Sequence, residues 1–239
     1  SHDELSRMSL YDIIDPIQFN ETQKELQQLI NKENVVNYVL RGFTKDGQYK
    51  DIEWNAKIGY GYHFFAIGRD VTNRIKQEAL KDYDTNHDVL TDCYNRRYIE
   101  DVFKILKNDE EILPVSIISC DVDNLKEIND EFGHAIGDEA IISISKILVD
   151  NCRPEDIVVR YGGDEFMIVL KKTIEDKAVQ IGHRIQKAKA HYLNNKEVSV
   201  SMGIASRKSL EQSFDEIIRH ADMRMYEDKR AKLKKRSKK

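Results

Sequence analysis

The pattern of hydrophobic and polar residues changes at about residue 72. Before this point, residues 35–44, 49–59 and 62–72 are rich in β-branched and aromatic side chains, and the turn-forming sequences KDGQ and GYG separate them. Such segments favour strands that are joined by tight turns. We therefore expect a helical opening followed by an antiparallel meander.

A charged segment follows the predicted meander. Residues 73–84, NRIKQEALKDYD, favour a helix, and Asp70 or Thr72 is in position to cap its first turn. The apolar contacts of this helix are few, so a single solvated helix and a short coiled coil both remain open. We expect a connecting helix here.

From residue 88 onward, helical and strand patterns alternate, which favours a sheet covered by helices. The run ILPVSIISC at residues 112–120 is continuously apolar and has the length of a strand, so we expect a central strand buried on both faces. Residues 157–161 and 166–170 predict a hairpin, and residues 197–206 predict a further strand. Helices are expected at residues 121–133, 137–148 and 213–233.

Composition and charge exclude several classes of protein. The 239 residues are 40% hydrophobic and 33% charged, and no apolar run approaches the roughly 20 residues that span a bilayer. The net charge of -4 argues against a DNA-binding protein, although the C-terminal tail is basic. Three scattered cysteines and the lack of a secretory leader indicate a cytoplasmic protein with reduced thiols, which could be a piece of a longer chain.

The candidate chemistry lies in two groups of acids. Asp121 and Asp123 follow the predicted central strand, and Asp164 and Glu165 follow a glycine pair in the predicted hairpin. If the strand at residues 157–161 pairs beside the central strand, the two groups meet at the edge where α/β sheets place ligands. Converging carboxylates repel one another unless a cation neutralises them, and oxygen ligands with room for water and phosphate suit Mg²⁺ or Mn²⁺.

Residues that suit a nucleotide lie beside these acids. Gly162 and Gly163 carry no side chain to block a ligand, and Lys126 and Asn129 lie three apart on one face of a predicted helix. An ammonium and an amide can therefore point at the same ligand. Asp138 follows at the expected cap of the next helix, and an amide with a carboxylate suits guanine, whose N1 and N2 hydrogens need acceptors.

Each of these features also has an ordinary structural explanation. Acidic hairpin turns are common on protein surfaces, Asp138 can serve as a helix cap, and His134 suits a turn better than a metal site. Their order along the chain is what favours a ligand site.

Successive motifs resemble the GGDEF domain of diguanylate cyclases over residues 84–233: DVLTDCYNRR, DVDNLKEINDEFGHAIGD, RYGGDEF, VSVSMGIA and ADMRMYEDK. The resemblance implies an α+β chain whose ferredoxin-like or nucleotidyl-cyclase-type α/β domain condenses two GTP into cyclic di-GMP and pyrophosphate. It implies that Asp121 and Asp164 bind metal, helped by the Val122 carbonyl and Glu165. Glu165 is also the expected general base.

The same resemblance implies how GTP is bound. Asparagine and aspartate would read guanine, lysines would hold phosphates, and two subunits would face each other in a homodimer because the family's domain binds one GTP. After the phosphate-binding lysine the family usually has two variable residues, a glycine and an arginine, but here Lys232 and Leu233 stand in the last two places. Lys232, Lys234 or Arg236 could replace the missing guanidinium contact. The residues expected to bind GTP are Lys126, Asn129, Asp138, Gly162, Gly163 and Lys229.

Two regulatory features are expected as well. Arg153 and Asp156 have the spacing of the family's RxxD inhibitory site, which would bind the product cyclic di-GMP. The first segment resembles the latter part of a PAS sensor domain whose opening strands are missing. The expected division is a partial PAS sensor at 1–72, a signalling helix at 73–87, the GGDEF cyclase at 88–233 and a basic tail at 234–239.

The favoured hypothesis is a PAS-regulated diguanylate cyclase. A second hypothesis, motivated by Leu233 and the incomplete sensor, makes the chain a receptor that binds GTP or cyclic di-GMP without chemistry. A third makes it a sensor and dimerisation module that shows no metal-dependent GTP binding. The intact acids favour the enzyme.

Overall fold

The chain divides into two compact units, residues 1–82 and 83–239. The expected helical opening lies outside the part of the chain that the computed structural model describes, and no helix within the described part has both the length and the apolar character needed to cross a membrane. The described residues are Asp12, Asp15, 36–58, 64–188, 190–192 and 196–236.

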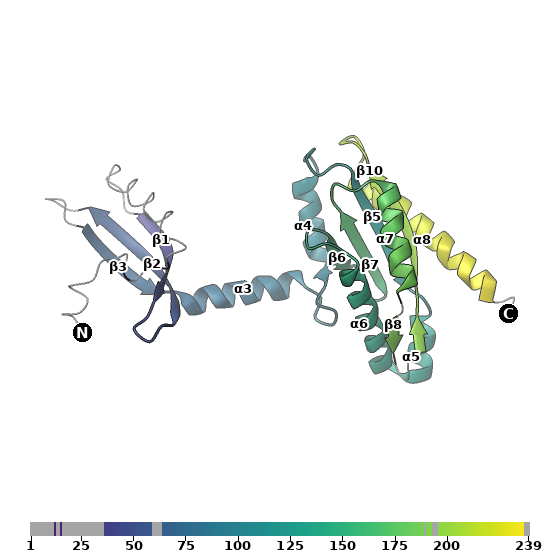
Figure 1. The fold of residues 1–239 in the computed structure, drawn as a ribbon, viewed down its shortest axis with the longest axis horizontal. Helices are drawn as coiled ribbons and strands as arrows, with labels where there is room; N and C mark the ends of the chain where they lie inside the picture. Colours follow the sequence, from purple (N-terminus) through teal and green to yellow (C-terminus); the bar gives the residue numbers. More distant parts are fainter. Residues whose placement is uncertain are drawn as a thin grey trace. The chain divides into compact units, whose positions relative to one another are not determined.

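The first unit carries a three-stranded antiparallel sheet (Figure 1), in the order β1 (Val36–Phe43), β2 (Tyr49–Ile58) and β3 (Phe64–Asp70). Gly47 lies in the turn between β1 and β2 with a φ of 76°, a conformation that glycine adopts without steric cost. The predicted meander is therefore confirmed.

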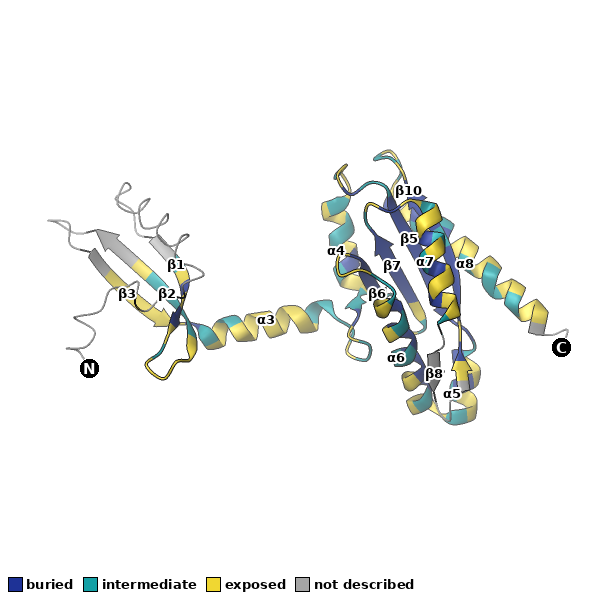
Figure 2. Ribbon diagram, viewed as in Figure 1, coloured by how far each residue is buried: buried dark blue, intermediate teal, exposed yellow. Residues whose placement is uncertain are grey.

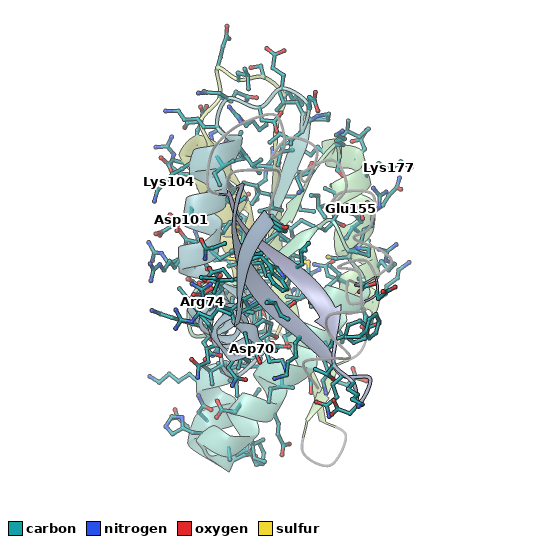
Figure 3. The ribbon with its side chains drawn as sticks, turned by 90° about the vertical axis from the view of Figure 1, so that its left-hand side faces the viewer. Asp70, Arg74, Asp101, Lys104, Glu155 and Lys177 are labelled. Atoms are coloured by element: carbon teal, nitrogen blue, oxygen red, sulfur yellow. The ribbon has the colours of Figure 1, made fainter. Side chains whose placement is uncertain are left out.

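Helix α3 (Thr72–Asn86) follows β3 directly. Asp70 accepts hydrogen bonds from the backbone N–H and the hydroxyl of Thr72, at 3.0 and 2.7 Å, and so stabilises the start of the helix. Arg74, in the first turn of α3, pairs with Glu53 of β2 at 2.7 Å. Asp70 and Arg74 are labelled in Figure 3. No residue of α3 is buried (Figure 2), which agrees with a connecting helix of few apolar contacts.

The second unit contains a mixed five-stranded sheet in the order β10-β5-β7-β6-β4. Neighbouring strands are antiparallel except for β4 and β6, which are parallel. A separate two-stranded sheet joins β8 (Ala190–Tyr192) to β9 (Lys196–Val198). The five strands are β4 (Tyr94–Asn95), β5 (Val115–Val122), β6 (Ile157–Arg160), β7 (Glu165–Leu170) and β10 (Val200–Arg207).

The expectation that residues 157–161 lie beside the central strand is wrong. Residues 157–160 form β6, whereas β5 lies between β10 and β7, the second strand of the hairpin. Only the first residue of β7 is exposed and the rest are buried, so β7 has the apolar character that a central position requires. β6 lies between β7 and the short strand β4.

Helices cover both faces of this sheet (Figure 1). Along β5 the side chains alternate, so that Ile117 packs in a core with α4 and α8, and Ile118 packs in a core with α6 and α7. Every residue of β5 is buried, as its continuous apolar run predicts (Figure 2). The helices are α4 (Arg96–Leu106), α5 (Leu125–Phe132), α6 (His134–Asp150), α7 (Glu175–Lys187) and α8 (Phe214–Arg236).

Candidate functional site

Strand pairing brings the predicted acids together at the end of β5. Asp121 lies opposite Glu165 in the antiparallel pair of β5 and β7, so both side chains lie on the same face of the sheet. The turn before β7 closes on the same point, because the Val122 N–H donates to the Asp164 carbonyl oxygen at 2.9 Å. The residues expected to bind metal are therefore neighbours.

Lys229 reaches this acidic group from α8. Its ammonium lies 2.5 Å from Asp121 Oδ1, and the Asp121 side chain is only 10% exposed. Burial raises the pKa of Asp121, the Lys229 ammonium works against this rise, and the charges of Asp164 and Asp123 add to it. A nearby cation therefore favours the ionised form of Asp121.

Glu165 also has a raised pKa. Burial is the largest cause, followed by the negative charges of Asp164 and Asp121. A raised pKa makes a carboxylate a better proton acceptor near neutral pH. A Cβ atom at Gly162 would lie 2.9 Å from Glu165 Oε2, so glycine leaves room for this side chain, whereas Gly163 faces open space.

Asp123 has a different environment from Asp121. It accepts hydrogen bonds from the hydroxyls of Ser199 and Ser201, at 2.6 and 2.5 Å, and pairs with the Lys232 ammonium at 3.1 Å. Burial acts to raise the pKa of Asp123, but these contacts outweigh it and lower the pKa. Because both of its oxygens are bonded within the protein, Asp123 suits a structural role.

The contacts of Lys232 bear on the position of Leu233. The Lys232 ammonium bonds to the Val200 carbonyl oxygen at 2.5 Å as well as to Asp123, so it is engaged within the protein. Leu233 is 51% exposed and offers no polar group to a phosphate. That Lys232, Lys234 or Arg236 replaces the guanidinium stays a prediction.

The residues expected to read guanine lie where α5 meets α6. A Cβ at Gly137 would come within 1.8 Å of Asn129 Oδ1, so the amide packs against this glycine. Asn129 Oδ1 is buried and has no hydrogen-bond partner among the described residues, so its capacity as an acceptor is unused. Asp138 is exposed in the second turn of α6 rather than at its cap, because the helix already begins at His134. Lys126 is exposed on α5.

The RxxD segment forms the turn before β6. The Arg153 N–H donates to Asp156 Oδ2 at 2.8 Å, while Asp156 Oδ1 is buried without a partner in the described part of the chain. Burial is the main cause that raises the pKa of Asp156. Since Arg153 is exposed, the pair combines an exposed guanidinium with a buried, unpaired acceptor.

A further contact that the sequence analysis did not single out supports the glycine turn. Arg160 pairs with Asp88 Oδ1 at 2.9 Å and donates to the Gly163 carbonyl oxygen at 2.8 Å. Asp88 also accepts a hydrogen bond from the Thr91 N–H at 3.0 Å. The sequence signal for this contact is an aspartate at the start of the first motif and an arginine just before the glycine pair.

The carboxylate and carbonyl oxygens at this site suit a hard divalent cation that is bound through few protein ligands. Within the described ranges, no group of three or more His, Cys, Asp or Glu residues is arranged to hold a metal ion. Mg²⁺ is commonly bound through one or two carboxylates, and water and substrate phosphates complete its coordination shell. Asp121 and Asp164, with the Val122 carbonyl, meet that requirement beside Glu165.

These features define a class of protein. A sheet with acids at the ends of two paired central strands and a lysine from the covering helix provides groups that suit a divalent cation together with a phosphate-bearing ligand. The family model described as "Diguanylate cyclase, GGDEF domain" matches residues 85–235. This match covers more than half of the chain, which therefore belongs to the GGDEF family.

Two similar proteins place this match in context. Diguanylate cyclase DosC of Escherichia coli (strain K12) is 36% identical over 160 residues, which cover 64% of this chain and 35% of DosC. The chain thus spans about a third of the length of this relative. The active GGEEF domain of a diguanylate cyclase from Vibrio cholerae has a TM-score of 0.53 at 31% identity, over 58% of this chain and 92% of that one.

A third comparison supports the fold alone. The coiled coil and GGDEF domain of DgcB from Caulobacter crescentus, solved in complex with c-di-GMP, has a TM-score of 0.60 at 22% identity. The similarity covers 66% of this chain and 88% of that one.

The environment of Asp156 predicts how stability responds to pH. Because burial raises its folded-state pKa, the ionised carboxylate is less favourable in the folded protein than in the unfolded chain. Its unfavourable contribution is therefore present at neutral pH and disappears as the pH falls through the raised pKa. An Asp156→Asn variant removes the charge and keeps an oxygen for the Arg153 N–H.

We expect this variant to be at least as stable as the parent at neutral pH, with a change within about 1 kcal/mol that shrinks towards about pH 4. Urea unfolding at both pH values measures the difference. A larger loss of stability that persists in acid would contradict the assignment.

Proposed function

We propose that this chain is a diguanylate cyclase that condenses two GTP molecules into cyclic di-GMP. The observation that carries the proposal is the acidic group at the end of β5, where Asp121 and Glu165 lie opposite each other and Lys229 contacts Asp121. An ammonium beside several carboxylates suits a site that holds a metal ion and phosphates together. Membership of the GGDEF family supports the same activity.

The proposed GTP contacts follow from the same geometry. The buried Asn129 Oδ1 would accept a hydrogen bond from guanine, and the exposed Asp138 on the adjoining helix would accept a second one. Lys126 and Lys229 would contact phosphates, and the open space beside Gly163 leaves room for them.

The reaction needs a proton acceptor and stabilisation of phosphate charge. The 3′-hydroxyl of one GTP attacks the α-phosphorus of the other, and the new P–O bond forms as the bond from that phosphorus to the oxygen bridging to the β-phosphate breaks, which releases pyrophosphate. The same attack in the opposite direction closes the ring and releases a second pyrophosphate. Glu165, whose pKa is raised, accepts the hydroxyl proton. A bound Mg²⁺ or Mn²⁺, held by Asp121, Asp164 and the Val122 carbonyl with help from Glu165, would supply charge neutralisation. Lys229 stabilises negative charge on the phosphates.

The reaction also implies a homodimer. Since one domain holds one GTP, two domains must face each other so that each supplies one half of the product. The first unit and α3 would set this arrangement: we propose a partial PAS sensor at 1–72 and a signalling helix at 73–87, ahead of the cyclase at 88–233 and a basic tail at 234–239. The antiparallel sheet that leads directly into α3 supports this order.

Contacts at the end of α3 suit the transmission of a signal. Tyr83 and His87 stack with ring centroids 3.9 Å apart, His87 lies 4.5 Å from Tyr94, and Tyr94 stacks on Tyr98 at 3.9 Å. Asp88 follows His87 in the sequence and pairs with Arg160, which donates to the Gly163 carbonyl oxygen in the glycine turn. A rotation of α3 would therefore reach the hairpin that carries Glu165.

The activity is tested by incubating the purified chain with GTP and Mg²⁺ and separating the products by chromatography. We expect the parent to make cyclic di-GMP and an Asp164→Ala variant to lose at least about a hundredfold in rate, since charge stabilisation at a reacting phosphate contributes on that scale. GTP that is bound but left unchanged, at concentrations where the protein dimerises, would instead support a receptor, to which Leu233 also points.

Product inhibition is the second part of the proposal. The exposed Arg153 would donate to a guanine of cyclic di-GMP, and the unpaired Asp156 Oδ1 would accept from it. We expect Arg153→Ala to raise the concentration of cyclic di-GMP that halves the rate by about tenfold or more, because a hydrogen bond to a charged group contributes about 1.5–3 kcal/mol. A variant as sensitive to product as the parent would rule out this site.

A further inference from the structure

The strand β10 lies at one edge of the five-stranded sheet. Within the described residues it pairs with β5 alone, so its other side has no neighbouring strand. Backbone groups of alternate residues in a strand point to the same side, and Val200, Met202 and Ile204 form such a set. An edge of this kind normally has to be covered by other groups or by water.

Side chains of α8 bond to these backbone groups one after another. Arg224 donates to the Ile204 carbonyl oxygen, and the Met202 N–H donates to Asp228 Oδ2 at 3.1 Å. Further along the helix, the Lys232 ammonium donates to the Val200 carbonyl oxygen at 2.5 Å. We call Arg224, Asp228 and Lys232 the edge ladder.

The spacing of helix and strand explains why the contacts repeat. Four residues of an α-helix rise about 6 Å, and two residues of a strand rise about 6.6 Å. Side chains at every fourth position of α8 therefore stay in step with every second residue of β10. The helix runs close to the strand, since a Cβ at Gly203 would lie 2.0 Å from the Ala221 carbonyl oxygen and 2.1 Å from the Met225 nitrogen.

Lys232, the last residue of the edge ladder, also lies beside the acids at the end of β5. Besides Val200, the Lys232 ammonium contacts Asp123 at 3.1 Å, the Ser201 hydroxyl at 3.2 Å and Asp228 at 3.2 Å. Lys229 lies between Asp228 and Lys232 in the sequence, on the part of α8 that these contacts hold. The ammonium of Lys229 can stay 2.5 Å from Asp121 only while α8 keeps this register.

We propose that Arg224, Asp228 and Lys232 are positioning residues, which occupy the free edge of β10 as a neighbouring strand would and fix the register of α8 that brings Lys229 to Asp121. The proposal rests on the proposed function only in taking Lys229 to be a GTP contact. Lys232 stands where the family usually has glycine, and Leu233 follows it where the family usually has arginine. This chain therefore has a side chain that can bond to β10 at the position before the missing arginine.

Replacement of Asp228 tests the edge ladder. Asp228→Asn keeps an oxygen that can accept from the Met202 N–H, whereas Asp228→Leu keeps a similar volume and removes the acceptor. We expect amide hydrogen exchange at Met202 to be about threefold to tenfold faster in the leucine variant, as the loss of one hydrogen bond predicts, and nearly unchanged in the asparagine variant. We expect GTP to bind several-fold more weakly to the leucine variant for the same reason.

Glu227→Leu is the matched control, because Glu227 is a neighbouring acid that is exposed on α8. Equal effects of the leucine replacements at 227 and 228, or no effect at 228, would overturn the proposal. GTP affinity and hydrogen exchange do not require turnover. A chain that makes no cyclic di-GMP would therefore refute the proposed function and leave this test intact.

A double variant separates the edge ladder from a plain ion pair. Asp228→Lys with Lys232→Asp keeps the opposite charges four residues apart, but it places a donor against the Met202 N–H and an acceptor against the Val200 carbonyl oxygen. The edge ladder predicts fast exchange at Met202 and weak GTP binding in the reversed pair. Recovery of parental exchange and affinity would show that only the ion pair matters.

Discussion

Carboxylates that lie close together in a partly buried site need a cation, and the end of β5 is organised around that requirement. Asp121 is buried beside Asp164 and opposite Glu165, and the Lys229 ammonium lies against it. The charges that disfavour ionised Asp121 in the protein alone are the ones that favour a divalent cation when a nucleotide is bound. Lys229 pairs with Asp121 in this structure, and in the proposed function it contacts the phosphates when GTP is bound.

The fold supplies this arrangement through one close contact between a helix and a strand. Gly203 lets α8 approach β10, and two lysines three residues apart on that helix then reach two different acids. Lys232 completes the bonding of Asp123, whereas Asp121 is bonded through Oδ1 to Lys229. Asp121 and Asp123, two residues apart, thus have pKa values shifted in opposite directions.

The sequence predicted the main strands and the helices α3, α5, α6 and α8, whose apolar patterns are clear, but it did not single out α4 or α7. It predicted less about the order of strands: nothing local in residues 157–161 reveals that β7, not β6, lies beside β5. The motifs led us to expect that Asp121 and Glu165 lie close together, and the pairing of β5 with β7 confirms this. They did not reveal that Asp123 is fully bonded or that Lys232 reaches back to Val200, since these contacts depend on how closely α8 packs on the sheet.

Binding of Mn²⁺ in the absence of nucleotide, compared between the parent and a Lys229→Met variant, tests this arrangement most directly. If the ammonium and the metal share Asp121, the variant should bind Mn²⁺ several-fold more tightly than the parent while its affinity for GTP falls, because the competing charge is gone and a phosphate contact is lost with it. Equal or weaker Mn²⁺ binding by the variant would contradict the view that Lys229 and the metal are alternative partners of Asp121.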